Sequence, residues 1–340
     1  MKIAITADPE IPVPPTLYGG IERIIFSLIE ELIRQGHEVT LFAHKDSKVP
    51  CRLIAYASNK RSRFGLVRNT VVITKTVLTT RFDVIHSFGR LAYLTFILPL
   101  GIKKVMSYQR EPTITQIKKA LKLSKQDSLI FTGCSNYITD KIKPIAPALT
   151  IYNFVDPSLY QLVEKVQPDA PLVFLGRIEY IKGAHIAIEA AKISGRKLIL
   201  AGNIPTEQHH KTYFKTMIEP FIDNETISYV GPVTDKQKND LLGRAAAFLM
   251  PVLWNEPFGI VMAEALACGT PIIGFPRGAI PEVIEDGQNG YICNNALEMA
   301  QKIQMTDKIS RLYCRDIALK KFSAKTIVSQ YLNAYLPPHD

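Results

Sequence analysis

Short apolar segments alternate with amphipathic segments along the whole chain. The apolar segments have the composition of buried strands, and the amphipathic ones repeat their apolar positions at helical spacing. Strands are predicted over residues 2–8, 37–44, 83–88, 104–109, 128–135 and 148–154, and again over 171–177, 197–202, 226–233, 246–252, 270–275 and 290–293. Helices are predicted over residues 21–36, 183–194, 235–245, 259–268 and 321–336, with others before residue 104 and from Asn136.

Strands that alternate with helices form parallel sheets covered on both faces. The alternation lapses once, near residues 155–171, and then starts again. A chain of 340 residues is also longer than a single hydrophobic core usually serves. The predicted fold class is therefore α/β, with two Rossmann-like, doubly wound parallel-sheet domains facing a cleft. We place the first domain at residues 1–160 and the second at residues 161–320.

Charge separates the two halves. Residues 1–155 hold 22 lysines and arginines against 11 acidic residues, whereas residues 156–340 hold 19 against 20. The whole excess of the formal net charge, +10, thus lies in the first half, which suits either an anionic partner or ordinary solubility. Five scattered cysteines without a C-x-x-C pair predict a reduced, cytoplasmic protein without a zinc site. No signal peptide is apparent, and the apolar runs are too short to span a bilayer.

Two stretches of the second half carry candidate chemistry. In GRIEYIKG, Arg177 and Lys182 lie between a predicted strand and a helix N-terminus, where two cations can neutralise a diphosphate. A solvated surface loop is the alternative reading. In NEPFGIVMAEALACGTP, Glu256 is predicted in a loop and Glu264 in the following helix. Each carboxylate can accept hydrogen bonds from one set of hydroxyls. The four residues together suit a nucleotide sugar, with a hexose at one end and a ribose at the other.

These stretches resemble a known enzyme family. Residues 230–293 are similar to the second-domain pattern of the retaining, nucleotide-sugar-dependent glycosyltransferases of family 4 (glycosyl transferases group 1), which have the GT-B fold. Glu256 and Glu264 resemble the E-x7-E motif of that family, GRIEYIKG its Arg-x4-Lys clamp, and YGGIERII, which begins at Tyr18, its first-domain glycine loop. The resemblance covers essentially the whole chain. It also implies that residues 321–340 form a C-terminal helix packing on the first domain.

The resemblance implies a role for each matching residue. Glu256 binds hydroxyls of the transferred sugar and Glu264 those of the ribose, while Arg177 and Lys182 hold the diphosphate and stabilise the leaving nucleotide. Glu256, Arg177 and Lys182 are the implied catalytic residues. The remaining donor-binding positions contribute main-chain amides or lie near the base: Gly19, Gly20, Val230, Pro232, Val233, Phe258, Gly259 and Ile260.

One departure from the family concerns a histidine. The family often has a His-x-His pair after the third predicted strand, and this chain keeps His86 but has Phe88 in the second position. His86 is therefore a candidate catalytic residue whose alternative is packing at a strand end. The chain contains no D-x-D tripeptide, so we expect no metal and no other cofactor, with the cations of the clamp in place of magnesium.

The implied reaction moves a hexose-type sugar from a nucleotide diphosphate sugar, UDP-linked first and GDP-linked second, to a hydroxyl of a lipid-linked or cell-envelope saccharide. Tyr108, Arg110 and Glu111, at the end of a first-domain strand, are candidate acceptor residues. Residues 59–69 and 114–126 mix basic with apolar side chains, and suit either an anionic membrane surface or an ordinary loop and a solvated helix. The protein is then cytoplasmic, with peripheral membrane attachment in the first case.

Other functions remain open at this stage. A GT-B enzyme that is not a transferase, such as a nucleotide-sugar epimerase, would release free sugar and nucleotide without an acceptor. A basic nucleic-acid-binding protein is a further alternative, but the second half is nearly neutral and no recognition motif is apparent, so no nucleic-acid partner is expected. The sequence leaves the choice between monomer and homodimer open.

Overall fold

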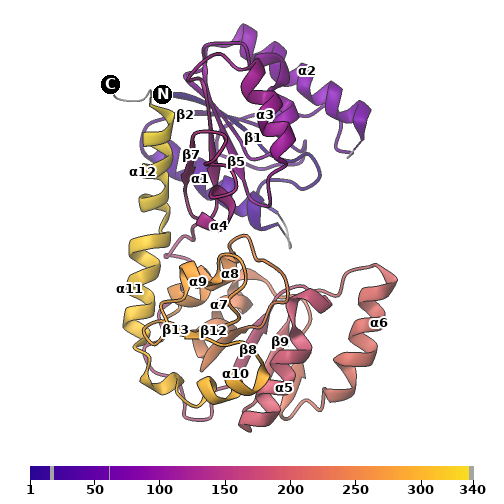
Figure 1. Ribbon diagram of the computed structural model, residues 1–340, viewed down its shortest axis with the longest axis vertical. Helices are drawn as coiled ribbons and strands as arrows, with labels where there is room; N and C mark the ends of the chain where they lie inside the picture. Colours follow the sequence, from indigo (N-terminus) through magenta and orange to yellow (C-terminus); the bar gives the residue numbers. More distant parts are fainter. Residues whose placement is uncertain (16–18, 61, 337–340) are drawn as a thin grey trace. The chain divides into compact units, whose positions relative to one another are not determined.

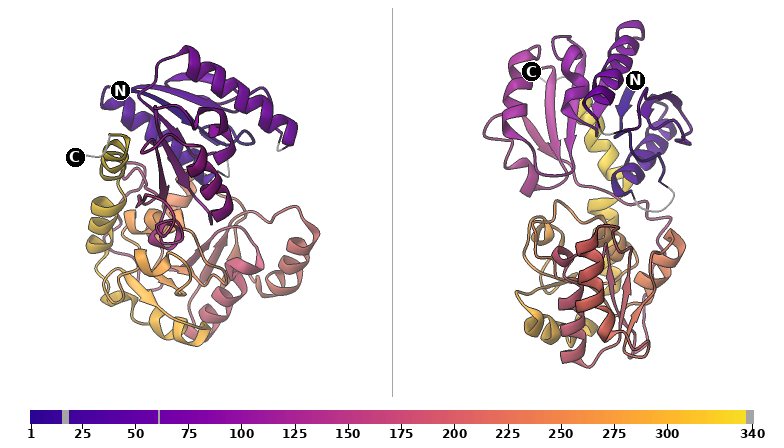
Figure 2. Two further views of the ribbon diagram at one scale, coloured as in Figure 1. Left: turned by 45° about the horizontal axis from the view of Figure 1, so that its top comes forward. Right: turned by 90° about the vertical axis from the view of Figure 1, so that its right-hand side faces the viewer.

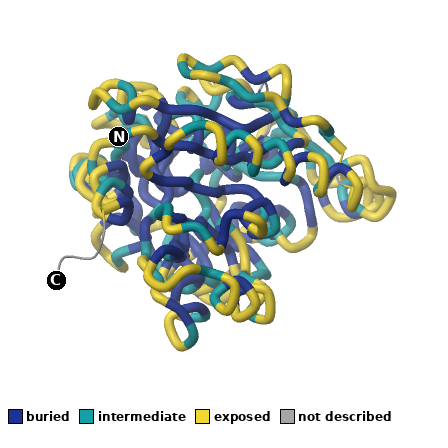
Figure 3. Tube along the Cα trace, turned by 90° about the horizontal axis from the view of Figure 1, so that it is seen from above, coloured by how far each residue is buried: buried dark blue, intermediate teal, exposed yellow. Residues whose placement is uncertain are grey.

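The computed structural model describes residues 1–15, 19–60 and 62–336 (Figure 1). The chain divides into two compact units, the first comprising Met1–Phe154 with Ala324–Asp340 and the second Val155–Ser323. The sequence placed the corresponding boundaries after residues 160 and 320. Helices lie on both sides of each central sheet (Figures 1 and 2), and the buried residues lie in the interior of the trace while the exposed ones lie at its periphery (Figure 3).

The first unit is built on a parallel sheet with the strand order β3-β2-β1-β4-β5-β6-β7. All six strands predicted for this half are confirmed, and β3 is one more that its short, half-exposed sequence did not reveal. The strands are β1 (Lys2–Thr6), β2 (Glu38–Ala43), β3 (Arg52–Ala55), β4 (Val84–Ser87), β5 (Lys103–Tyr108), β6 (Leu129–Gly133) and β7 (Ala148–Thr150).

Two groups of helices cover this sheet. Helix α1 packs against α12, and α2 and α3 both pack against the 3-10 helix η1. Their bounds are α1 (Gly20–Arg34), α2 (Arg63–Thr79), η1 (Leu91–Ile97), α3 (Ile114–Leu123), α4 (Asn136–Thr139) and α12 (Ala324–Tyr335). The sequence did not predict α2, whose Ser62 caps the helix by accepting a hydrogen bond from the backbone N–H of Gly65.

The prediction of one continuous helix over residues 321–336 is wrong. Helix α11 (Arg311–Phe322) ends before Ser323, and α12 starts at Ala324. The break coincides with a contact to a residue far away in the sequence: the Phe322 carbonyl accepts a hydrogen bond of 2.9 Å from the backbone N–H of Val155, and Val155 pairs with Ser323 in an isolated parallel bridge. Ser323 is accordingly extended, with φ −79° and ψ 150°.

The second unit contains a parallel sheet with the strand order β10-β9-β8-β11-β12-β13, and all six strands predicted for it are confirmed. The strands are β8 (Leu172–Leu175), β9 (Leu198–Ala201), β10 (Ile227–Tyr229), β11 (Ala247–Met250), β12 (Ile272–Gly274) and β13 (Gly290–Ile292). Its helices are α5 (Ala184–Ser194), α6 (Gln208–Met217), α7 (Asp235–Arg244), α8 (Ile260–Ala267), α9 (Ile280–Val283), α10 (Ala296–Ile303) and α11, with η2 (Tyr180–Lys182), η3 (Glu219–Phe221) and η4 (Thr306–Lys308).

Each sheet has one point at which the direction of strand succession reverses. In the first sheet this point lies between β1 and β4, and in the second between β8 and β11. Loops that leave the carboxyl ends of two such strands diverge to opposite faces of the sheet, and the crevice between them is where open α/β sheets bind ligands. The fold therefore marks one ligand-binding edge in each unit.

Candidate functional site

The predicted diphosphate and sugar residues lie at the switch point of the second sheet. Arg177 follows β8, and Lys182 ends η2, separated from α5 by Gly183. Glu256 follows β11, and Glu264 lies on α8, the next helix. The structure thus brings loops from the two diverging strands to one edge, as the family motifs require.

Lys182 and Glu256 are in direct contact. The Lys182 Nζ donates to Glu256 Oε2 at 2.7 Å, and the indole N–H of Trp254 donates to the same oxygen at 3.1 Å. The ammonium also lies 4.6 Å from the centre of the Trp254 ring. The two charged side chains are only 17% and 10% exposed, so the ion pair is screened little by solvent.

Two glycines allow the backbone to hold this pair. Gly183 has a left-handed φ of +78°, and a Cβ there would stand 2.0 Å from the Pro251 carbonyl oxygen, so the loop that carries Lys182 lies directly on the end of β11. Gly278 has φ +62°, and a Cβ there would lie 2.3 Å from the Glu256 carbonyl oxygen. The backbone at Gly183, next to Lys182, therefore packs directly against Pro251. The backbone at Gly278 packs directly against that of Glu256.

Arg177 is held separately from Lys182. Its guanidinium Nη1 lies 2.8 Å from Glu179 Oε1, and the ring of His210 approaches the same carboxylate oxygen at 3.8 Å. The Glu179 side chain is 5% exposed, whereas that of Arg177 is 37% exposed. Glu179 therefore anchors the guanidinium of an arginine that stays partly exposed after the end of β8.

Glu264 has its own set of contacts. The Tyr160 hydroxyl donates to Glu264 Oε1 at 2.6 Å, and Lys238, on α7, forms an ion pair with the same oxygen. The Lys238 ammonium lies 5.4 Å from the centre of the Tyr160 ring. Burial, and then the charge of Glu264, raises the pKa of Tyr160, so the phenol stays a hydrogen-bond donor. Both contacts reach one oxygen of the carboxylate.

The remaining donor-binding candidates lie on two segments of this unit. Gly259 has a left-handed φ of +76° and caps the start of α8, where the first backbone N–H groups have no partner within the helix. The side chain of Phe258 is buried against Phe322, so only its main chain is available to a ligand. At the carboxyl end of β10, Val230 is 48% exposed, and Pro232 and Val233 follow it.

Gly19 and Gly20 belong to the first unit, at the start of α1. Gly19 is the N-cap residue, and no side chain caps this end of the helix. Tyr18, with which the glycine motif begins, lies outside the described residues. The start of α1 thus has the backbone N–H groups that the motif predicts for binding an anion or hydroxyls.

His86 lies inside the first unit, with no exposed surface. Its Nδ1 pairs with the Tyr335 hydroxyl at 2.7 Å and its Nε2 with the Ser107 hydroxyl at 2.6 Å. The rings of Phe88 and Tyr331 pack on it at centroid distances of 4.2 and 4.7 Å. Burial lowers the pKa of His86 to about 3, so the imidazole is neutral at physiological pH.

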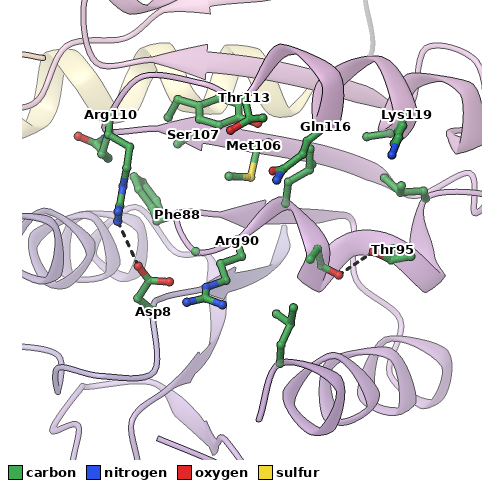
Figure 4. Close-up of a pocket in the computed structure, with 18 of the residues that line it drawn as sticks. Asp8, Phe88, Arg90, Thr95, Met106, Ser107, Arg110, Thr113, Gln116 and Lys119 are labelled. Atoms are coloured by element: carbon green, nitrogen blue, oxygen red, sulfur yellow. Dashed lines mark hydrogen bonds and ion pairs between the residues drawn. The ribbon is translucent and has the colours of Figure 1, made fainter. Parts of the chain in front are cut away.

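The three acceptor candidates line one pocket of the first unit (Figure 4), which has a volume of about 690 Å³. Tyr108, Arg110 and Glu111 enter it from the carboxyl end of β5. Arg110 forms an ion pair of 3.5 Å with Asp8, which follows β1, and Glu111 one of 2.6 Å with Lys141. The pocket therefore begins at the switch point of the first sheet.

Sequence reasoning missed several of these residues. Trp254 stands only two positions before Glu256, and as the single tryptophan of the chain it was a usable signal. No sequence signal pointed to Tyr160 or Lys238, because these residues contact Glu264 from 104 and 26 positions away in the sequence. Asp8 and Gln109, at strand ends next to predicted site residues, were detectable by the rule that ligands bind at the carboxyl edge of the sheet.

Two family models and a curated relative match this chain. The family model described as "Glycosyl transferases group 1" matches residues 163–320, and the one described as "Glycosyltransferase Family 4" matches residues 18–159. Spore coat protein SA of Bacillus subtilis is 25% identical over 98% of this chain and 99% of its own.

Two solved structures extend the comparison. AviGT4, a glycosyltransferase involved in avilamycin A biosynthesis, is 25% identical with a TM-score of 0.71, over 98% of this chain and 96% of its own. HepE of Anabaena in complex with UDP and glucose is 20% identical with a TM-score of 0.73, over 98% of both chains. With the motifs at the sheet edge of the second unit, these matches identify the chain as a glycosyltransferase of family 4 with the GT-B fold.

Proposed function

We propose that the protein transfers a hexose-type sugar from a UDP-sugar to a hydroxyl of a lipid-linked or cell-envelope saccharide, with retention of configuration and without a metal. The observation that carries the proposal is the contact of Lys182 with Glu256 at the switch point of the second sheet. Lys182 can bind a phosphate, and Glu256 can accept hydrogen bonds from sugar hydroxyls. Because the two side chains are adjacent, they can bind the phosphate and the sugar on either side of the bond that joins them. UDP is preferred to GDP because HepE, which shares the fold, was solved with UDP-glucose.

In this proposal the donor lies along the carboxyl edge of the second sheet. Arg177 and Lys182 bind the diphosphate, and Glu256 accepts hydrogen bonds from the transferred sugar. Glu264 binds the ribose hydroxyls through the carboxylate oxygen that Tyr160 and Lys238 leave open. Val230, Pro232 and Val233 contact the base, and the amides of Phe258, Gly259 and Ile260 assist the sugar. We assign to Gly19 and Gly20 the distal phosphate or the sugar.

The chemistry follows from the charges. The bond between the anomeric carbon and the phosphate oxygen breaks, and its electron pair leaves with UDP, whose growing negative charge Arg177 and Lys182 stabilise. The acceptor oxygen bonds to the same face of the anomeric carbon, and its proton passes to the departing phosphate. We assign no catalytic role to His86, since it is enclosed and both ring nitrogens are engaged.

A melting-temperature panel tests the donor assignment. UDP, UDP-glucose, UDP-N-acetylglucosamine, GDP and GDP-mannose are added to the purified protein over a range of concentrations. We expect UDP and a UDP-sugar to raise the melting temperature with concentration, because a ligand stabilises the state that binds it. If only the guanosine compounds raise the melting temperature, the donor is a GDP-sugar and not a UDP-sugar. If no nucleotide raises it, the proposal is contradicted. Recovery of the sugar on an added acceptor, rather than free in solution, separates a transferase from an epimerase.

We also propose that the first unit attaches to anionic membranes. Helix α2 exposes Phe64, Val67, Val71 and Leu78, whose spacing places them on one face, and Arg63 and Arg68 accompany them. No helix of the described chain is long and apolar enough to cross a bilayer.

Co-sedimentation with phosphatidylglycerol vesicles at low salt tests the attachment. We expect Phe64→Asp to weaken it and the exposed Leu297→Asp, on α10 of the other unit, to leave it unchanged. Binding that survives Phe64→Asp would contradict this assignment.

A further inference from the structure

The pocket of the first unit has two chemically different parts. Figure 4 shows Asp8 and Arg110 at one end, Thr95 and Lys119 at the other, and Arg90 between them. The part that follows β1 and β5 is polar and includes Asp8, Tyr108 and Gln109. The part contributed by α2, η1 and α3 is largely apolar, with Leu66, Leu91, Ala92, Ala120 and Leu123 in its lining.

Three buried polar atoms at this pocket have no hydrogen-bond partner among the described residues. They are Asp8 Oδ1, the Tyr108 hydroxyl and Gln109 Nε2. Tyr108 is 91% buried, and burial raises the pKa of its hydroxyl to about 12, so the group is neutral. An unpaired buried polar atom is unfavourable, so three at one site indicate a ligand that completes their hydrogen bonds. An acceptor, a donor and a hydroxyl together match neighbouring hydroxyls of a sugar ring.

The pocket also contains cations without acidic partners. Arg110 is paired with Asp8, and Glu111 is paired with Lys141. Arg90 and Lys119 line the pocket, and the described residues offer neither of them an ion pair. Arg90 is half-buried and lies in the middle of the view in Figure 4. A guanidinium in that position favours an anion with several oxygens, such as a phosphate.

Apolar side chains continue from the pocket to the surface. Leu123, in the lining, is 54% exposed, and Phe96, on the neighbouring η1, is 58% exposed. Helix α2 contributes Leu66 to the lining and α3 contributes Ala120 and Leu123, and both helices also carry basic side chains. The apolar part of the pocket therefore includes one leucine that is also exposed at the surface, where it can meet a bilayer.

We propose that this pocket binds the acceptor as a sugar joined through a phosphate to a hydrocarbon chain, with the sugar hydroxyls at Asp8, Tyr108 and Gln109, the phosphate at Arg90, and the chain between α2 and α3. This inference rests on the proposed transferase function and names the chemical class of its acceptor. The hydrocarbon chain supplies affinity because its methylene groups leave water, and the polar end orients the hydroxyl that reacts.

Calorimetry on the whole purified protein tests the proposal with three small probes. Geranyl phosphate carries the chain and the phosphate, geraniol only the chain, and glucose 1-phosphate only the sugar and the phosphate. All three are used below the concentration at which geranyl phosphate aggregates. We expect geranyl phosphate to bind at least tenfold more tightly than either of the others. Absence of binding, or equal binding of glucose 1-phosphate, would overturn the proposal.

Substitutions locate the binding. Arg90→Gln is expected to weaken geranyl phosphate at least tenfold, and Leu123→Asp at least threefold. Their matched controls, Arg81→Gln and Leu297→Asp, change exposed residues away from the pocket and should alter binding less than twofold. Equal effects of test and control variants would place the ligand elsewhere. UDP binding is measured on the same samples. If UDP binds normally and geranyl phosphate does not bind, only the inference about the acceptor is contradicted. If geranyl phosphate binds and UDP does not, only the proposed donor is contradicted.

Discussion

The Lys182 ammonium and the Glu256 carboxylate, which we assign to the diphosphate and to the transferred sugar, are joined by a hydrogen bond of 2.7 Å. The two side chains are mostly buried, and each charge is balanced by the other. Neither charge therefore needs a bound ion to balance it. The contact also fixes the relative position of the two groups that flank the bond to be broken. Substitution of either partner should therefore separate binding from catalysis.

The first prediction compares the two partners. Lys182→Met removes a charge-assisted contact worth about 1.5–3 kcal/mol and should weaken UDP at least tenfold. Glu256→Gln keeps the size of the side chain but removes the carboxylate from the sugar, so the rate of transfer should fall about a hundredfold while UDP affinity stays within threefold. Calorimetry and an initial-rate assay measure the two effects, with the exposed Lys211→Met and Glu189→Gln as controls. Wild-type transfer by Glu256→Gln would remove Glu256 from the reaction.

The second prediction uses the single tryptophan of the chain. Trp254 donates to Glu256 and lies under the Lys182 ammonium, so a diphosphate that draws Lys182 away changes the surroundings of the indole. UDP should therefore change the tryptophan emission in a saturable way, with a midpoint equal to the calorimetric dissociation constant. A Trp254→Phe variant should lose the signal. A protein saturated with UDP but with unaltered emission would show that the nucleotide binds away from Trp254.

The third prediction concerns the ribose. If Glu264 binds the ribose hydroxyls, UDP should bind more tightly than 2′,3′-dideoxy-UDP to the wild-type protein, by about tenfold or more. In Glu264→Gln the ratio should fall towards one. Tyr160→Phe should reduce the ratio less, because it removes one support of the carboxylate and leaves Lys238 in place. An undiminished ratio in Glu264→Gln would assign the ribose to another residue.

The fourth prediction follows from His86, whose pKa is lowered from 6.5 to about 3 by burial. Below pH 6.5 the unfolded chain takes up a proton that the folded chain does not, so this residue's contribution to stability is present above pH 6.5 and is lost as the pH falls towards 3. The loss is at most about 1.4 kcal/mol per pH unit, or about 2 kcal/mol between pH 6.5 and 5.

Melting curves at pH 7 and pH 5 measure this effect. The melting temperature of the wild-type protein should fall more between these values than that of His86→Gln, and Tyr335→Phe, which keeps the imidazole, should behave like the wild type. A transfer assay on His86→Gln provides the opposite test. If the variant melts like the wild type but transfers at a hundredth of its rate, His86 acts in the reaction and not in packing.

All the strands except β3 were predictable because they are apolar runs between loop residues, and such runs leave little ambiguity, whereas β3 is short and half-exposed. Helix α2 was not, since much of it consists of threonine and valine, which favour strands. The signal that was present is the cap at Ser62. The break at Ser323 was hidden for another reason: it depends on a hydrogen bond with Val155, 168 residues earlier in the chain.

In the donor site, too, some residues could be predicted from local sequence and others could not. Arg177, Lys182, Glu256 and Glu264 stand out because their types and spacings match a family pattern. The partners of Glu264 and of His86 could not be inferred, because packing brings together residues such as His86 and Tyr335, which are 249 positions apart. A residue that supports another across such a distance leaves no local trace.

The hydrogen bond between Val155 and Phe322 joins the first and the last part of the second unit. This unit therefore begins and ends at one place, as an insert within the sequence of the first, which resumes at Ala324. A unit whose two ends lie together can be inserted or exchanged at a single junction, which leaves the first unit and its pocket unaltered.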